Sequence, residues 1–179
     1  MVTKLFKIFL FCSLLCFLQS CPKLGEEVCD DASKSAHVPD LVSIIPLKPV
    51  YNAGDEVIFK LNIPSENNYF SNMPVNLYQK TGISNGWYIA SSTNLFDQNQ
   101  VTYNKGSKKE GAVNWHNLKY NPGNMMYELE IKVKLNRTGD YSIYIDDRVD
   151  FLGTPECNRY FIYTTYSGST SKRIEFKVQ

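Results

Sequence analysis

Apolar and polar side chains alternate with a period of two along much of the chain after residue 40. The alternation is clearest over residues 127–135, where five apolar positions alternate with charged or amide side chains. This pattern is typical of a β-strand with one buried and one solvated face. It also predicts strands over residues 57–63, 141–145 and 174–178, with weaker runs over residues 41–47, 75–79, 87–91, 101–103 and 160–166.

Turn-forming sequences separate these runs, and no stretch keeps a helical period. Residues that preset a turn or tolerate positive φ occur at Ala53-Gly54-Asp55, Asn85-Gly86, Asn121-Pro122-Gly123 and Thr138-Gly139-Asp140. The 12 tyrosines and many β-branched residues suit pleated, half-buried surfaces. About nine short strands predict an all-β fold, either an antiparallel two-sheet sandwich or a small closed barrel.

The first 21 residues have the organisation of an export signal. Lys4 and Lys7 precede a largely apolar run over residues 8–18, shorter than the about 20 residues of a membrane-spanning helix. The run ends at Leu18-Gln19-Ser20-Cys21, which resembles a bacterial lipobox, with Gln19 a less usual residue at its position. The resemblance implies a lipoprotein that is cleaved before Cys21 and lipidated on that cysteine. We therefore expect the protein to be exported and anchored by lipid to the outer membrane. Whether it faces the periplasm or the cell surface stays open.

The chain is therefore predicted to have three parts. Residues 1–20 form the signal peptide, and residues 21–40 form the lipidated N-terminus and a flexible acidic tether, since they are poor in apolar side chains. Residues 41–179 form a single domain. Two cysteines remain after lipidation, Cys29 and Cys157. An even pair in an oxidising compartment predicts a disulfide between them, and the alternative is two unpaired thiols.

Residues 135–141 read Leu-Asn-Arg-Thr-Gly-Asp-Tyr, which resembles the tyrosine corner of immunoglobulin-like domains. In that corner a Tyr after a Gly-containing turn donates a hydrogen bond to upstream backbone. Residues 51–63 resemble the second-strand entry of exported lipoproteins with such sandwiches. A lipocalin-type barrel would carry its Gly-x-Trp signature at the first strand, whereas Gly86-Trp87 lies in mid-chain and lacks the spacer. The resemblance implies an immunoglobulin-like sandwich, with the barrel as the alternative.

The net charge and the lack of catalytic motifs narrow the range of functions that we expect for the chain. The formal net charge is +1, without a cluster of Lys and Arg, so we expect no nucleic-acid partner. His37 falls in the tether, and we expect His116 to be partly exposed. The chain has neither a Gly-x-Ser-x-Gly elbow nor a His-Glu-x-x-His helix. We therefore expect no enzymatic activity and no cofactor.

Two acidic groups have structural explanations. Asp146, Asp147 and Asp150 are weak candidates for calcium binding, but Arg148 lies between them and a solvated charged loop explains them better. Glu128 and Glu130 share a strand face that continues with two lysines. We expect that face to be a solvent surface with cross-strand charge pairing rather than a glycosidase pair.

Aromatic side chains are the most suggestive functional feature. In residues 160–166 both strand faces carry rings, and only one of them can face the core of a sandwich. Exposed rings with polar neighbours are common at sugar- and protein-binding surfaces, although a loop or the tether could instead cover them. The candidate ligand contacts are Trp87, Tyr88, Trp115, Tyr160 and Tyr166. We predict a non-catalytic binding module for a glycan or an envelope protein, the alternatives being a structural accessory subunit of an envelope complex or a hydrolase.

Overall fold

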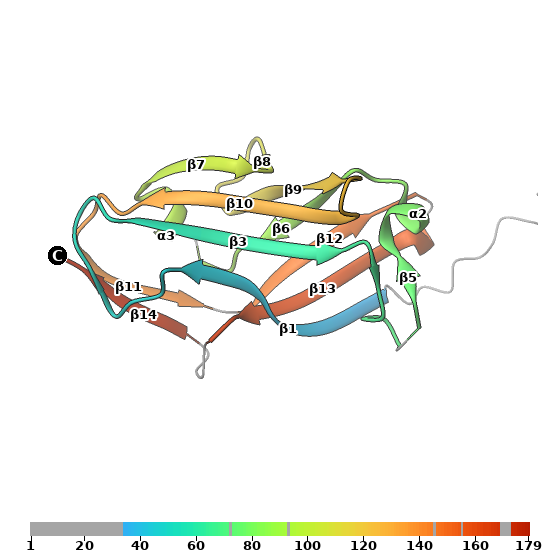
Figure 1. Cartoon of the computed structure of the whole chain (residues 1–179), viewed down its shortest axis with the longest axis horizontal. Helices are drawn as coiled ribbons and strands as arrows, with labels where there is room; N and C mark the ends of the chain where they lie inside the picture. Colours follow the sequence, from blue (N-terminus) through green and yellow to red (C-terminus); the bar gives the residue numbers. More distant parts are fainter. Residues whose placement is uncertain (1–33, 72, 93, 145, 155, 169–172) are drawn as a thin grey trace, which may run out of the picture. The chain divides into compact units, whose positions relative to one another are not determined.

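The computed structural model describes residues 34–71, 73–92, 94–144, 146–154, 156–168 and 173–179. These residues form strands with a few short helices, so the predicted all-β class is confirmed (Figure 1). The elements in chain order are β1 (Lys34–Ile45), β2 (Val50–Tyr51), β3 (Glu56–Pro64), β4 (Glu66–Asn67), β5 (Val75–Asn76), α2 (Leu77–Thr81), β6 (Asn85–Ile89), α3 (Asn94–Asp97), β7 (Gln100–Lys105), β8 (Ser107–Lys108), β9 (Trp115–Asn121), β10 (Met126–Lys134), β11 (Gly139–Tyr144), β12 (Asp147–Leu152), η1 (Glu156–Asn158), β13 (Arg159–Tyr166) and β14 (Arg173–Val178).

The strongest alternating segments form the centre of the largest sheet. β10 pairs antiparallel with β3 over its whole length, from Met126 opposite Pro64 to Lys134 opposite Glu56. The alternating apolar positions, from Val57 to Ile63 and from Tyr127 to Val133, are completely buried, because side chains along a strand point alternately to its two faces. The period of two therefore predicted both the strands and the face that forms the core.

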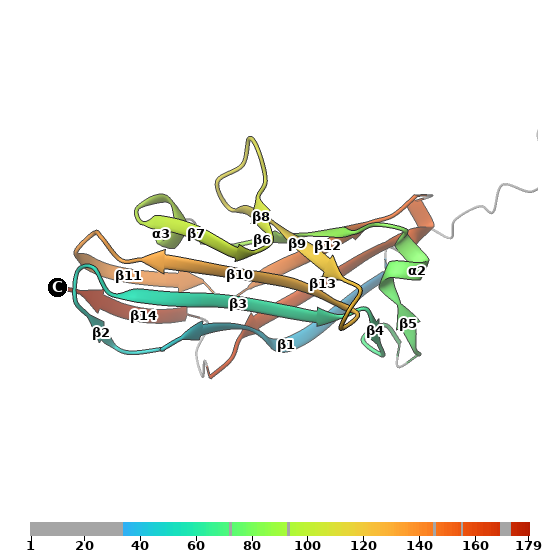
Figure 2. The same ribbon diagram turned by 45° about the horizontal axis from the view of Figure 1, so that its top comes forward.

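The largest sheet closes on itself. Hydrogen bonds connect β10, β3, β1, β13, β12, β6 and β9 in a ring, which the pairing of β9 with β10 completes. β10 pairs with β9 at residues 126–128 and with β7 at residues 130–134. β7 and β9 therefore diverge along β10, and the loop between β8 and β9 projects from the sheet (Figure 2). The closed barrel, which the sequence left as the alternative to a sandwich, therefore describes how the strands of this sheet are hydrogen-bonded.

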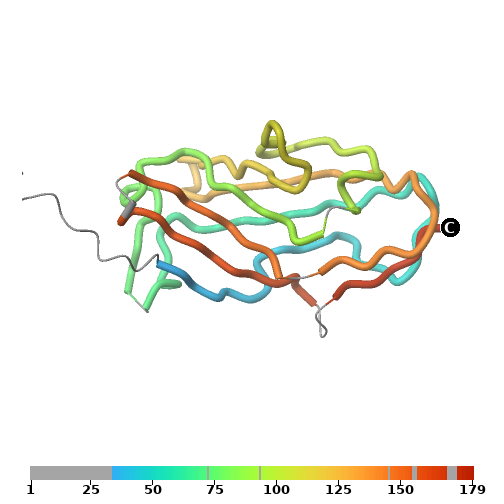
Figure 3. The backbone as a smooth tube through the Cα atoms, turned by 180° about the vertical axis from the view of Figure 1, so that it is seen from behind, coloured from blue at the N-terminus to red at the C-terminus, as the bar shows by residue number. Residues whose placement is uncertain are grey.

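The sheets are mixed, so the expectation of purely antiparallel pairing was wrong. β1 pairs parallel with β13, and β14 pairs parallel with β2. Apolar alternation is the same whichever way a strand runs, and strand direction depends on how distant segments meet in space. β1 lies next to β13 although more than a hundred residues separate them in the chain (Figure 3).

A second sheet contains β11, β14 and β2. The rings of Tyr141 and Phe176 stack at 5.0 Å between centroids, and both are part of the same buried core as the larger sheet. The Tyr141 hydroxyl donates a hydrogen bond of 3.0 Å to the carbonyl oxygen of Arg137. The hydrogen bond predicted from the tyrosine-corner sequence is therefore present.

Three local expectations differ from the structure. Of the strand expected over residues 75–79, only Val75–Asn76 is extended, because the side chain of Asn76 caps α2 by accepting a hydrogen bond from the Gln79 N–H. Residues 34–40, expected to belong to the tether, form the first half of β1 and place His37 on it. Residues 147–150, expected in a solvated loop, lie within β12.

Candidate functional site

Side by side, β9, β6, β12 and β13 present a row of aromatic and charged side chains on their outer surface. The register places Trp87 opposite Asp150, and Asp150 opposite Phe161. In the next row, Ile89 lies opposite both Trp115 and Arg148, and Arg148 lies opposite Tyr163. We call Trp87, Trp115, Arg148, Asp150, Phe161 and Tyr163 the outer aromatic face.

The two tryptophans of this face form one cluster with a lysine. Their ring centroids are 5.8 Å apart. The ammonium nitrogen of Lys109, at the base of the projecting β8–β9 loop, lies 3.3 Å from the centroid of Trp87 and 4.1 Å from that of Trp115. Lys109 is half-buried, whereas its neighbours Lys108 and Glu110 are exposed. This loop residue therefore covers part of both indole rings.

An ion pair lies at the centre of the outer aromatic face. The Nε atom of Arg148 is 2.7 Å from Oδ1 of Asp150, and its Nη2 donates a 3.0 Å hydrogen bond to Oδ2. The Asp150 side chain is almost completely buried. Burial raises the pKa of Asp150, and the charges of Arg148 and Lys109 oppose that rise. The guanidinium carbon of Arg148 also lies 5.7 Å from the centroid of Phe161, which continues the alternation of rings and charges.

The structure separates the five aromatic residues predicted as ligand contacts. Trp87 and Trp115 are half-buried on the outer aromatic face. In contrast, at most 1% of Tyr88, Tyr160 and Tyr166 is exposed, so the expectation that these rings form an exposed surface was wrong. Each points to the opposite face from its outward neighbours because a strand alternates its side chains. The accessible rings of β13 are instead Phe161 and Tyr163. The sequence placed these two rings on the face opposite to Tyr160 and Tyr166, but it did not show which of the two faces is the core.

The acidic candidates for calcium binding do not converge. Asp146 is exposed, Asp147 is completely buried on the inner side of β12, and Asp150 is on the outer side. The expected solvated loop was therefore wrong for Asp147 and Asp150. Among the described residues, no group of three or more His, Cys, Asp or Glu side chains is arranged to hold a metal ion.

Asp147 belongs to a buried polar network. It accepts hydrogen bonds from the hydroxyls of Tyr88 and Ser91, and the Tyr88 and Tyr166 hydroxyl oxygens lie 3.2 Å apart. Burial raises the pKa of Asp147, although the hydrogen bond from Tyr88 opposes that rise. Burial also raises the pKa of both tyrosines well above their usual value. These groups connect β6, β12 and β13 inside the protein.

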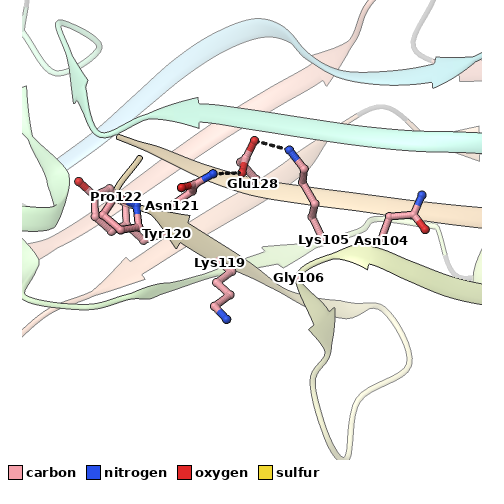
Figure 4. A pocket seen from close by; sticks show the side chains of 8 residues that line it. All are labelled: Asn104, Lys105, Gly106, Lys119, Tyr120, Asn121, Pro122 and Glu128. Atoms are coloured by element: carbon pink, nitrogen blue, oxygen red, sulfur yellow. Dashed lines mark hydrogen bonds and ion pairs between the residues drawn. The ribbon is translucent and has the colours of Figure 1, made fainter. Parts of the chain in front are cut away.

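A polar hollow of about 470 Å³ lies where β7 and β9 separate along β10 (Figure 4). At its wall, Glu128 is 6% exposed and forms a 2.6 Å ion pair with Lys105. The amides of Asn121 and Asn124 also donate to Glu128, at 3.0 and 3.3 Å. The hydrogen bond from Lys105 is the main cause that lowers the pKa of Glu128. The predicted cross-strand charge pairing is confirmed, but the expectation that Glu128 faces solvent was wrong.

Gly106 allows the chain to approach β9 closely at this hollow. Its φ angle is +81°, and a Cβ atom would lie 2.3 Å from the carbonyl oxygen of Asn117 and 2.7 Å from the Leu129 side chain. Only glycine fits this combination of conformation and contact. The residue therefore allows the chain to leave β10 at Lys105 and to pair with β9 from Ser107 onward.

A second hollow, of about 360 Å³, contains His116 among its lining residues. The expectation that His116 is partly exposed was wrong, since only 1% of it is exposed. Its Nδ1 atom is 2.7 Å from the Tyr103 hydroxyl, and its ring centroid is 4.5 Å from that of Phe96. Burial lowers the pKa of His116 to about 4, helped by the charge of Lys108. The imidazole is therefore neutral at physiological pH.

The predicted lipidation site and half of the predicted disulfide lie outside the described residues. Neither Cys21 nor Cys29 is among them, so cleavage, lipidation and the pairing with Cys157 stay predictions. Cys157 lies in η1, and its carbonyl oxygen accepts a 3.3 Å hydrogen bond from the Lys34 ammonium. No helix within the described ranges is long and apolar enough to cross a membrane.

Comparisons with known proteins add little to this geometry. No protein-family model matches the chain, and no curated protein matches it significantly. Among solved structures, the chain is similar to AggA, the major subunit of aggregative adherence fimbriae type I from Escherichia coli, at 11% sequence identity. The match covers 73% of this chain and 99% of AggA with a TM-score of 0.32. A likeness this weak supports no argument about function.

Proposed function

We propose that this chain is a lipid-anchored cell-envelope protein that binds another protein through the outer aromatic face, without catalysis. One observation carries the proposal: tryptophan, tyrosine, phenylalanine and arginine side chains lie together, half-buried, on one strand surface. Trp, Tyr and Arg are the residues that contribute most binding energy at protein interfaces. A protein ligand is favoured over a glycan because Lys109 shows that the two indole rings accept an ammonium group, which protein surfaces carry as lysine side chains.

The acidic groups support binding rather than catalysis. Glu128 is held by Lys105 and two amides, and Asp150 is held by Arg148. Asp147 accepts hydrogen bonds inside the core. These three carboxylates lie in separate parts of the fold rather than across one cleft, so they do not form the pair of acids that glycoside hydrolysis requires.

We also infer that the fold is a variant of the immunoglobulin-like sandwich. The ring of strands can be divided into β10, β3 and β1 on one side and β13, β12, β6 and β9 on the other, joined by the parallel β1–β13 pairing and the short β9–β10 pairing. The hydrogen bond from Tyr141 to Arg137 supports this reading, because it is the bond of the tyrosine corner.

Crosslinking in the envelope of the native host tests the binding proposal. The full chain should capture a defined protein, and the double variant Phe161→Ala/Tyr163→Ala should lose it. Tyr144→Ala is the matched control, because Tyr144 is 49% exposed on the other sheet. Equal capture by all three proteins would contradict the proposal. Saturable binding to a glycan array, lost in the same double variant, would replace it with the sugar-binding alternative.

A Cys21→Ala variant tests the anchor separately. We expect it to remain an unprocessed precursor without acyl mass, because lipidation requires the cysteine sulfur. Mass spectrometry of the membrane fraction gives the result directly. Normal processing and acylation of this variant would contradict the anchor without affecting the binding proposal.

A further inference from the structure

Lys109 lies over two indole rings of the outer aromatic face, near a carboxylate of the same face. Its ammonium nitrogen lies within 4.1 Å of the centroids of both Trp87 and Trp115. Asp150, directly opposite Trp87 in the register, is close enough for the positive charge of Lys109 to oppose the rise of its pKa. Two indole faces and a carboxylate are the groups that attract an organic cation. We call Trp87, Trp115 and Asp150 the ammonium cage.

The geometry points to the ammonium cage as the site where a lysine side chain of the partner protein binds, in place of the chain's own Lys109. This inference rests on the proposed function and names the chemical group that the outer aromatic face recognises. The occupant in the structure is a primary ammonium on an aliphatic stem, so a lysine side chain is the group whose fit to the two indoles the geometry shows. A partner lysine would make the same contacts with the two indoles, near the Asp150 carboxylate that Arg148 holds.

Exchange of the two lysines requires little change in the backbone. The Lys109 N–H donates a 3.0 Å hydrogen bond to the Trp115 carbonyl oxygen, so the main chain is fixed at this point independently of the side chain. The Lys109 side chain has only to rotate towards solvent, where Lys108 and Glu110 already lie. Lys109 then acts as an internal competitor that lowers the apparent affinity for an external ammonium group.

Removal of the competitor provides the test. The probe is Nα-acetyl-lysine N-methylamide, titrated against the purified full-length protein while tryptophan fluorescence is followed. The detergent must be non-ionic, because zwitterionic detergents carry an ammonium group of their own. We expect Lys109→Gln to bind the probe about 5- to 30-fold more tightly than the wild type, from the strength of cation–π contacts that are partly desolvated. Lys108→Gln makes the same change of charge one residue away and should match the wild type.

Further titrations make the result specific. Nα-acetyl-glutamine N-methylamide should leave the fluorescence of Lys109→Gln unchanged, and Lys109→Gln/Trp115→Leu should lose the response to the lysine probe. Equal affinity of Lys109→Gln and wild type, or no binding by either, would overturn the inference. A response to tetramethylammonium without a response to the lysine probe would also overturn it and assign the cage to small quaternary ammonium compounds.

The two proposals can fail separately. Capture of a partner that depends on Phe161 and Tyr163 but is not strengthened by Lys109→Gln would leave the proposed function intact and contradict the lysine exchange. Tighter binding of the lysine probe by Lys109→Gln, without capture of any protein, would contradict the proposed function and the partner lysine that rests on it, and would leave only the ammonium-binding property of the cage.

Discussion

Asp147 and Ser91 are joined by two hydrogen bonds to the same carboxylate oxygen. The Ser91 N–H donates to Oδ1 at 2.8 Å, and the Ser91 hydroxyl donates to it at 2.7 Å. The other oxygen, Oδ2, accepts from the Tyr88 hydroxyl. A carboxylate with this many donors can stay inside the core, whereas an unpaired one would be strongly destabilising. The pair therefore joins the end of β6 to the start of β12.

The Asp147 network predicts a large difference between two adjacent aspartates. Asp147→Ala should lower the free energy of unfolding by about 2 to 4 kcal/mol, because Tyr88 and Ser91 would lose their buried acceptor. Asp146→Ala is the control, since Asp146 is exposed, and its effect should stay within about 0.5 kcal/mol. Urea denaturation followed by fluorescence measures both, and equal effects would show that the network does not stabilise the fold.

The buried imidazole of His116 predicts a loss of stability in acid. Its pKa is about 4 in the folded protein and about 6.5 in an unfolded chain. The unfolded state therefore binds the proton more tightly, and stability falls as the pH drops from about 6.5 towards 4. The contribution of His116 at pH 4.5 should be about 2 to 3 kcal/mol smaller than at pH 7.5.

A non-titrating variant isolates this contribution from those of the carboxylates. Between pH 7.5 and pH 4.5, the free energy of unfolding of His116→Phe should fall by about 2 to 3 kcal/mol less than that of the wild type. The wild type and His116→Phe would show parallel pH dependence if His116 did not titrate between the two pH values.

Gly106 and Gly111 separate steric contact from backbone conformation. Both have positive φ angles, +81° and +76°, but a Cβ atom on Gly106 would meet Asn117 and Leu129, whereas one on Gly111 meets nothing within 4 Å. Gly111→Ala should cost about 1 kcal/mol, from the left-handed conformation alone. Gly106→Ala should cost at least about 2 kcal/mol more. Thermal unfolding compares them, and similar midpoints would mean that β7 and β8 move apart from β9 easily.

The predicted disulfide between Cys29 and Cys157 can be tested by mass spectrometry of unreduced peptides. Cys157 lies near the start of β1, since Lys34 contacts its carbonyl oxygen, and Cys29 is only five residues before Lys34. Cys29→Ser and Cys157→Ser should each lower stability by about 2 to 5 kcal/mol. The double variant should lose no more than either single one, because all three lack the same bond. Free alkylation of both thiols in the oxidised protein would contradict the pairing.

Part of the candidate site was visible in the sequence. The alternation over residues 160–166 showed that Tyr160 and Tyr166 face away from Phe161 and Tyr163, and Trp87 and Trp115 were identified as candidates. The wrong choice among them has a physical cause: when both faces of a strand carry rings, only packing against other strands decides which face is excluded from water. The position of Lys109 over the two indoles could not be predicted from the sequence. A lysine in a polar loop is expected to be solvated, and only the fold brings this one over the rings of Trp87 and Trp115.

The burial of these ionisable residues could not be predicted from the sequence either. Glu128 occupies a polar position in an alternating strand, and it is buried because the side chains of Lys105, Asn121 and Asn124 gather around its carboxylate. His116 and Asp147 are buried for a similar reason, since their partners Tyr103, Ser91 and Tyr88 come from other segments of the chain. Local composition does not contain these contacts.

The sequence by itself determined the all-β class, the central strands and the hydrogen bond from Tyr141 to Arg137, because alternation and turn chemistry act between near neighbours in the chain. Only the tertiary structure decided the parallel pairing of β1 with β13, the closure of β9 onto β10, and the surface on which aromatic and charged side chains meet. These features depend on contacts between residues far apart in the chain, and a period of two is the same for a strand whatever its partner.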